Sequence, residues 1–211
     1  MSGTVPRSKS DSEVTGADPI SGTHDPKRGN VLTLMLLRHA KSAWDEPGLR
    51  DIERPLNARG RGAAPLMGQY LAHNDLLPDL TLCSTAVRTR QTLALVQAEW
   101  PTPSPVEFSA QLYETPASAL QRTIAAERPG PLERLLLIGH NDGLSDFACY
   151  LAARGPHGPQ RDALLAKFPT AALAIFDCAI SRWADLTPDN AVLRTFVTPR
   201  QLAARNNDDS A

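Results

Sequence analysis

Short apolar runs that alternate with stretches of helical periodicity constrain the fold of this chain more than any other feature. Residues 32–37 form a continuous apolar run, as expected for a strand buried on both faces of a sheet. Further strands are predicted over 80–83, 106–108, 135–138, 171–176 and 192–197, and helices over 57–73, 87–100, 116–127 and 141–153. This alternation predicts an α/β fold with three α/β/α layers and a central, mainly parallel, mixed sheet, in which the late strands are antiparallel.

The two ends of the chain differ in composition from its middle. Residues 1–30 contain hardly any large apolar side chains, so they cannot bury enough surface to offset the entropy of ordering them. We therefore expect a disordered tail over 1–30, one folded domain over 31–200, and a flexible C-terminal tail over 201–211. The proline-containing stretches 101–105 and 155–159 are interpreted as loops.

Composition narrows the classes of function. Lys and Arg number 22 against 23 Asp and Glu, a balance that gives no support for binding nucleic acid or a membrane surface. Cys83, Cys149 and Cys178 lack the spacing of a zinc site, and their odd number argues against a full disulfide framework. No apolar run approaches the ~20 residues of a membrane helix, and the N-terminus lacks the apolar core of a signal peptide. A cytoplasmic protein is the expectation.

Polar residues that can bind phosphate follow three of the predicted buried strands. Arg38 and His39 follow the first strand, Arg88 lies shortly after the second, and His140 follows the strand over 135–138. In open α/β sheets, sites lie outside the carboxyl ends of the strands. Taken singly, Arg88 could be an exposed helix arginine and His140 a satisfied core histidine. Together, the four residues predict one shared site.

Phosphoryl transfer is the chemistry that suits this set of residues. Arginine forms bidentate bonds to phosphate, and a neutral imidazole can carry a phosphoryl group covalently. A second histidine can hold a phosphoryl oxygen and stabilise developing charge. The helix that starts near Asn141 would direct free backbone N–H groups at the same anion. No carboxylate cluster suitable for magnesium accompanies these residues, so neither a metal nor another cofactor is expected.

Several motifs together resemble one known family. The run Arg38-His39-Ala40-Lys41-Ser42 is similar to the Arg-His-Gly signature of the histidine phosphatase (phosphoglycerate mutase-like) superfamily, and Ser84 with Arg88, Gln91 and Thr92 is similar to its second motif. Gly139-His140-Asn141 resembles the third. The stretch 51–60 and the alanine after the first histidine narrow the resemblance to the short SixA-type phosphohistidine phosphatase branch. The resemblance covers roughly residues 33–180 and implies a phosphoglycerate mutase-like fold.

The resemblance also implies roles for individual residues. His39 would be the nucleophile, and Arg38, Arg88 and His140 would complete the phosphate pocket, with Asn141, Ser42 and Arg54 as further substrate-binding candidates. Asp51 and Arg54 lie in a segment that either shapes the rim of the site or forms a surface ion pair. Glu114 is a candidate general acid; alternatively, it is a helix-start carboxylate favoured by the helix dipole near Pro116.

The resulting hypothesis is a two-step, metal-independent hydrolysis through a phosphohistidine on His39. We expect no long insertion over the site, and an open site suits a phosphohistidine carried by a partner protein. Two alternatives remain. The chain could hydrolyse small phosphate esters or nucleotides with Glu114 as acid, or it could be a non-catalytic module that binds phosphate or phosphopeptides. The oligomeric state is left open.

Overall fold

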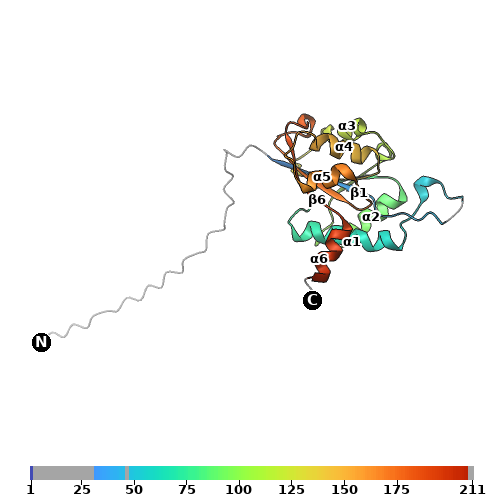
Figure 1. Cartoon of the computed structure of the whole chain (residues 1–211). Coiled ribbons are helices and arrows are strands. Elements are labelled where there is room, and N and C mark those ends of the chain that lie inside the picture. The colour runs from blue at the N-terminus through green and yellow to red at the C-terminus, as the bar shows by residue number, and fades with distance from the viewer. Residues whose placement is uncertain (2–30, 46–47, 209–211) are drawn as a thin grey trace.

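A computed structural model describes Met1, residues 31–45 and residues 48–208 of the chain (Figure 1). Its sheet has six strands in the order β3-β2-β4-β1-β5-β6. The strands are β1 (Leu32–Arg38), β2 (Leu80–Ser84), β3 (Val106–Ser109), β4 (Arg134–Gly139), β5 (Leu173–Cys178) and β6 (Ala191–Val197). The helices are α1 (Ala58–His73), α2 (Val87–Gln97), α3 (Ala117–Ala125), α4 (Gly143–Ala152), α5 (Pro159–Ala166) and α6 (Pro199–Asp208). Short 3-10 turns are η1 (Asp51–Glu53), η2 (Ala110–Leu112) and η3 (Trp183–Asp185).

The sheet is mixed, as the sequence predicts. Strands β1, β4, β2 and β3 pair in parallel, whereas β5 is antiparallel to β1 and β6 is antiparallel to β5. The parallel strands β1, β2 and β4 therefore present their carboxyl ends at one edge. This edge is where the predicted phosphate-binding residues follow their strands.

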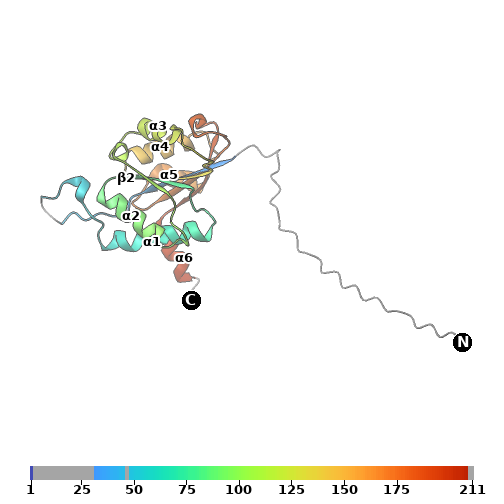
Figure 2. The same ribbon diagram turned by 180° about the vertical axis from the view of Figure 1, so that it is seen from behind.

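Helices cover both faces of the sheet, and alternate residues of β1 enter two separate cores. Leu34 and Leu36 pack in one core with residues of α3, α4 and α5, whereas Met35 and Leu37 pack in the other with residues of α1, α2 and α6. Both views show α3 and α4 on one side of the sheet and α1, α2 and α6 on the other (Figures 1 and 2). The prediction of a three-layer α/β/α fold is confirmed.

The prediction of a flexible tail over residues 201–211 is wrong for residues up to 208, because α6 extends to Asp208. The side chain of Leu202 is 7% exposed and packs in the core beside α1. Thr198 and Gln201 form a reciprocal helix cap, in which Gln201 Oε1 accepts from Thr198 N at 2.8 Å and Thr198 Oγ1 accepts from Gln201 N at 3.4 Å. The predicted disordered tail over 1–30 lies outside the described residues, apart from Met1.

Two further features of the fold concern its helices. No helix was predicted between residues 153 and 171, yet α5 begins at Pro159, the last residue of the predicted loop over 155–159. Proline stands in the first turn of this helix, where the missing N–H is tolerated. Across the described part of the chain, the helices are too short or too polar for any of them to span a membrane.

Candidate active site

A small cavity of about 220 Å³ lies at the carboxyl ends of β1, β2 and β4. Its walls combine cationic, anionic and imidazole side chains. The lining residues are Arg38, His39, Lys41, Ser42, Trp44, Asp51, Arg88, Glu114, His140, Asn141 and Thr170. The structure thus brings together the four predicted residues from the ends of three separate strands, and a cavity of this size suits a phosphoryl group.

His39 is held with one particular nitrogen free. Its side chain is 7% exposed, and Nδ1 lies 2.8 Å from the carbonyl oxygen of Ala40. A carbonyl only accepts, so Nδ1 donates and the lone pair of the neutral ring resides on Nε2. Burial lowers the pKa of His39 to about 4, and the charges of Arg88 and Arg38 act in the same direction against the Ala40 hydrogen bond. His39 is therefore neutral near pH 7, with the lone pair on Nε2 free.

His140 lies beside His39, with the ring centroids 5.1 Å apart. Its Nε2 is 2.8 Å from Ser84 Oγ, and this hydroxyl also accepts weakly from Ala86 N at 3.5 Å. Burial, followed by the neighbouring charges of His39 and Arg88, lowers the pKa of His140 to about 3. If the Ser84 hydroxyl donates its proton to Nε2, the neutral ring carries its own proton on Nδ1. This Nδ1 is buried without a hydrogen-bond partner among the described residues, so it is free to donate to a phosphoryl oxygen.

Arg38 and Asn141 are both anchored by the same backbone oxygen. Arg38 Nη1 donates to Phe168 O at 2.9 Å, and Asn141 Nδ2 donates to it at 3.1 Å. Arg38 Nε and Asn141 Oδ1 are buried without partners in the described part of the chain. A buried donor without a partner is costly, so Arg38 Nε is well placed to be satisfied by a bound anion.

Arg88 is fixed from the opposite wall by Asp51. Its side chain is 5% exposed; Nη1 donates to the Asp51 carbonyl at 2.6 Å, and Nη2 lies 2.9 Å from Asp51 Oδ2. Tyr113 Oη donates to the same carboxylate oxygen at 2.7 Å. Although partial burial opposes the change, the Tyr113 hydrogen bond and the charges of Arg88 and Arg54 lower the pKa of Asp51. Tyr113 was not predicted as a site residue; only its place beside Glu114 in the sequence hinted at it.

Glu114 also lines the cavity, but it lies farther from Arg88 than Asp51 does. Its Oε1 is 3.7 Å from Arg88 Nη2, and its side chain is 56% exposed. Helix α3 begins at Ala117, with Pro116 as the preceding cap residue. The position is thus compatible with both interpretations of Glu114, as an acid at the mouth of the cavity or as a carboxylate before a helix.

Arg54 and Trp44 form the outer rim. Arg54 pairs with Asp51 Oδ1 at 3.3 Å, so the predicted ion pair is present, and its guanidinium carbon lies 3.2 Å from the centroid of the Trp44 ring. Arg54 itself is outside the lining of the cavity. Ser42 lies inside it, is buried, and forms an isolated antiparallel bridge with Leu56. The rim is therefore made by the segment 51–56 folded against the segment that follows β1.

Side chains of α2 tie these segments together. Thr92 Oγ1 accepts from Ala40 N at 2.9 Å and donates to Arg88 O at 2.7 Å, so it couples the turn after His39 to the helix that carries Arg88. Gln91 Oε1 accepts from Leu56 N at 2.7 Å. Gly60 permits a close approach, because a Cβ there would lie 2.2 Å from the carbonyl oxygen of Lys41. The Gln91-Thr92 pair thus has a structural role in the site.

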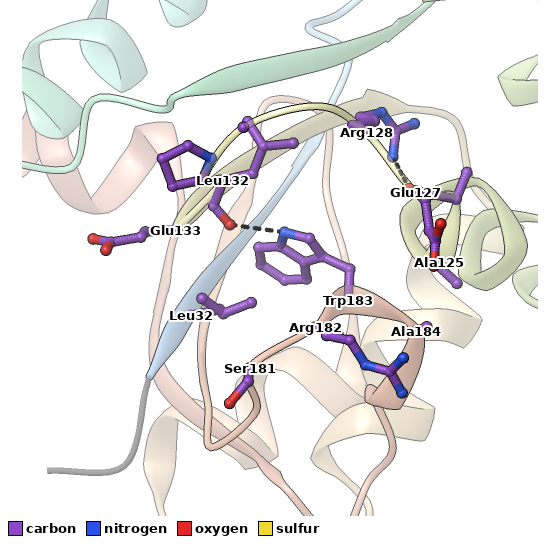
Figure 3. Close-up of a pocket in the computed structure, with 13 residues that line it drawn as sticks. Leu32, Ala125, Glu127, Arg128, Leu132, Glu133, Ser181, Arg182, Trp183 and Ala184 are labelled. Atoms are coloured by element: carbon purple, nitrogen blue, oxygen red, sulfur yellow. Dashed lines mark hydrogen bonds between the residues drawn. The ribbon is translucent and has the colours of Figure 1, made fainter. Parts of the chain in front are cut away.

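A larger cavity, of about 430 Å³, lies at the opposite end of the sheet (Figure 3). It is lined by Leu32 at the start of β1, by Glu133 just before β4, and by Trp183, whose indole N–H donates to Leu132 O at 2.9 Å. Its lining includes no histidine, and neither Arg38 nor Arg88 lines it. The smaller cavity is therefore the better candidate for phosphate chemistry.

An α/β fold with two arginines and two histidines converging at the carboxyl edge of its sheet defines a protein class that handles phosphoryl groups. Residues 34–159 match the model of the histidine phosphatase superfamily (branch 1), and the chain belongs to this superfamily. An uncharacterized protein of Mycobacterium tuberculosis is 37% identical over 168 residues, which are 78% of this chain and 100% of that protein.

Two solved structures place the chain beside the SixA-type branch, as the sequence predicts. A protein of Nakamurella multipartitia, assigned as phosphohistidine phosphatase SixA, is 29% identical, with 80% of this chain and 96% of that chain covered and a TM-score of 0.69. A protein of Agrobacterium tumefaciens with the same assignment is also 29% identical, with coverages of 80% and 98% and a TM-score of 0.66.

Proposed function

We propose that this protein is a metal-independent phosphatase that acts through a phosphohistidine intermediate on His39 and that its substrate is a phosphohistidine carried by another protein. One observation carries the proposal. A neutral imidazole, with Nδ1 fixed by the Ala40 carbonyl, shares a phosphate-sized cavity with Arg38 and Arg88. Nucleophile and anion-binding groups are therefore preorganised before substrate arrives.

The reaction proceeds in two displacements. In the first, the lone pair of His39 Nε2 attacks phosphorus, an N–P bond forms, and the bond to the leaving group breaks with its electron pair. A phosphohistidine substrate whose other ring nitrogen carries a proton thereby departs as a neutral imidazole. Arg38, Arg88 and His140 hold the phosphoryl oxygens during this step. In the second, a water oxygen attacks phosphorus, the Nε2–P bond breaks, and inorganic phosphate leaves with the proton of the water lost to solvent. His39 is thereby returned to its neutral form.

The chemistry of the leaving group favours phosphohistidine as the substrate. An imidazole has a pKa near ~6.5, so it departs with far less protonation than a sugar or serine alkoxide needs. Two carboxylates lie near the cavity. Asp51 is held in an ion pair with Arg88, and Glu114 is exposed at the surface. The SixA assignment of structures with 29% identity supports the same substrate class.

Trapping the intermediate tests this proposal. The protein is mixed with a ³²P-labelled phosphohistidine peptide, quenched rapidly at alkaline pH, digested and mapped by mass spectrometry. We expect label on His39, none in His39→Asn, and normal labelling in His157→Asn, which replaces an exposed histidine outside the cavity. Phosphate release by wild type without label on His39, or near-normal turnover by His39→Asn, would contradict the mechanism.

A second candidate function is hydrolysis of small phosphate esters or nucleotides with Glu114 as the general acid. The observation that favours it is the position of the Glu114 carboxylate in the lining of the cavity. A large loss in Glu114→Gln that is confined to alkyl esters would support this function. Tight binding of inorganic phosphate without turnover of either substrate class would instead support a non-catalytic binding module.

A further inference from the structure

Trp44 is placed unusually for a tryptophan. It is 69% exposed although tryptophan side chains are largely buried on average, and it lines the cavity that holds His39. One face of its indole is covered by the guanidinium of Arg54, whose carbon lies 3.2 Å from the ring centroid. The ring is therefore oriented by a cation–π contact while much of its surface remains open to solvent.

Arg54 is itself held in place by the site. Its side chain is only 17% exposed and pairs with Asp51, which also binds Arg88. The orientation of Trp44 is thus linked through two ion pairs to a phosphate-binding arginine. An arrangement of this kind holds an aromatic surface at a fixed place beside the mouth of the cavity.

The size of the cavity determines what meets this surface. About 220 Å³, shared among eleven lining residues, accommodates a phosphoryl group, while the rest of a substrate must project through the mouth. In-line attack by His39 Nε2 directs the leaving group away from His39, and the part of it that the cavity cannot hold must extend to the rim. The leaving group of a bound substrate therefore passes close to Trp44.

We propose that Trp44 is a specificity-determining residue that stacks on a planar, aromatic leaving group, such as the imidazole of a phosphohistidine. This inference rests on the proposed phosphatase function and deepens it. Substrates with a flat ring next to the scissile bond gain the contact, and substrates with an ammonia or alkyl leaving group do not. Stacked aromatic pairs typically contribute enough to change a rate by about two- to twelvefold.

A ratio of two rates tests the proposal. Phosphoimidazole and phosphoramidate both present a P–N bond to His39, but only the first carries a ring. We expect the ratio of their kcat/KM values to fall about two- to twelvefold in Trp44→Ala and to stay near that of wild type in Trp44→Phe. The matched control is Phe108→Ala, which removes an aromatic side chain that is 49% exposed and lies under Arg90, outside the cavity; its ratio should equal that of wild type.

Two outcomes would overturn the inference, and they can be told apart. An unchanged ratio in Trp44→Ala, even if both rates fall together, would mean that Trp44 only supports Arg54 and Asp51, and it would leave the phosphatase function standing. A wild-type protein that hydrolyses neither compound, nor a phosphohistidine peptide, would overturn the proposed function and this inference with it.

Discussion

The two buried histidines of the cavity make the stability of this protein depend on pH in a defined window. In the unfolded chain an imidazole titrates near ~6.5, whereas burial holds the pKa of His39 at about 4 and that of His140 at about 3. Below pH ~6.5 the unfolded state therefore binds protons that the folded state does not. The contribution of the two histidines to the free energy of unfolding is fully present above pH ~6.5. It is lost progressively as pH falls toward the folded-state pKa values.

The magnitude follows from the linkage relation. Between pH ~6 and pH ~5, each of the two histidines lowers the free energy of unfolding by about 1 kcal/mol, and the pair by roughly 2 kcal/mol. Urea denaturation at the two pH values measures the difference, and the same measurement on the double variant His39→Asn/His140→Asn isolates the contribution of these rings. His157→Asn controls for the loss of an exposed imidazole. Equal pH dependence in wild type and the double variant would refute the desolvation of these rings.

Three further changes test other parts of the site and fold. Arg88→Lys removes the forked bonds to Asp51 and those proposed to hold phosphate, so kcat/KM should fall by about 10² or more; a loss below about threefold would contradict the role of Arg88. Glu114→Gln should reduce kcat on a phosphohistidine peptide by less than about threefold, because imidazole leaves without a strong acid; a steady-state assay showing a much larger loss would restore Glu114 as the acid. Leu202→Ala should lower the free energy of unfolding by about 2 kcal/mol in urea titration; no change would mean that α6 adds nothing to the core.

Much of the architecture could be predicted because each buried strand leaves a strong local signal. The run at 32–37 became the central strand β1, and the polar residues after β1 and β4 marked the edge where the cavity lies. This argument needs only the rule that parallel strands end at one edge. It therefore located Arg38, His39 and His140 without knowledge of any contact between them.

The C-terminal helix could not be predicted from composition alone, although its sequence contained a usable signal. Residues after 200 are mostly polar, and among residues 201–205, whose side chains the structure describes, only Leu202 is buried in the core. The pattern of Thr198, Pro199 and Gln201 is a capping box with proline at the first helical position, which indicates a helix start rather than a tail. This cap, unlike the average polarity, predicts that the folded domain extends past residue 200.

The protonation states in the cavity lay beyond any reading of the sequence, because they depend on partners that are distant or belong to the backbone. The Ala40 carbonyl accepts from Nδ1 of His39 and so leaves Nε2 free. The Ser84 hydroxyl, which is 56 residues from His140 in the sequence, contacts Nε2 of His140. Asp51 looks like a surface carboxylate in the sequence, yet it fixes Arg88 from 37 residues away. A motif can thus name the groups that meet phosphate, but the fold determines the tautomer and charge with which they meet it. Catalysis requires the second kind of information, since a His39 protonated on both nitrogens could bind phosphate and could not attack it.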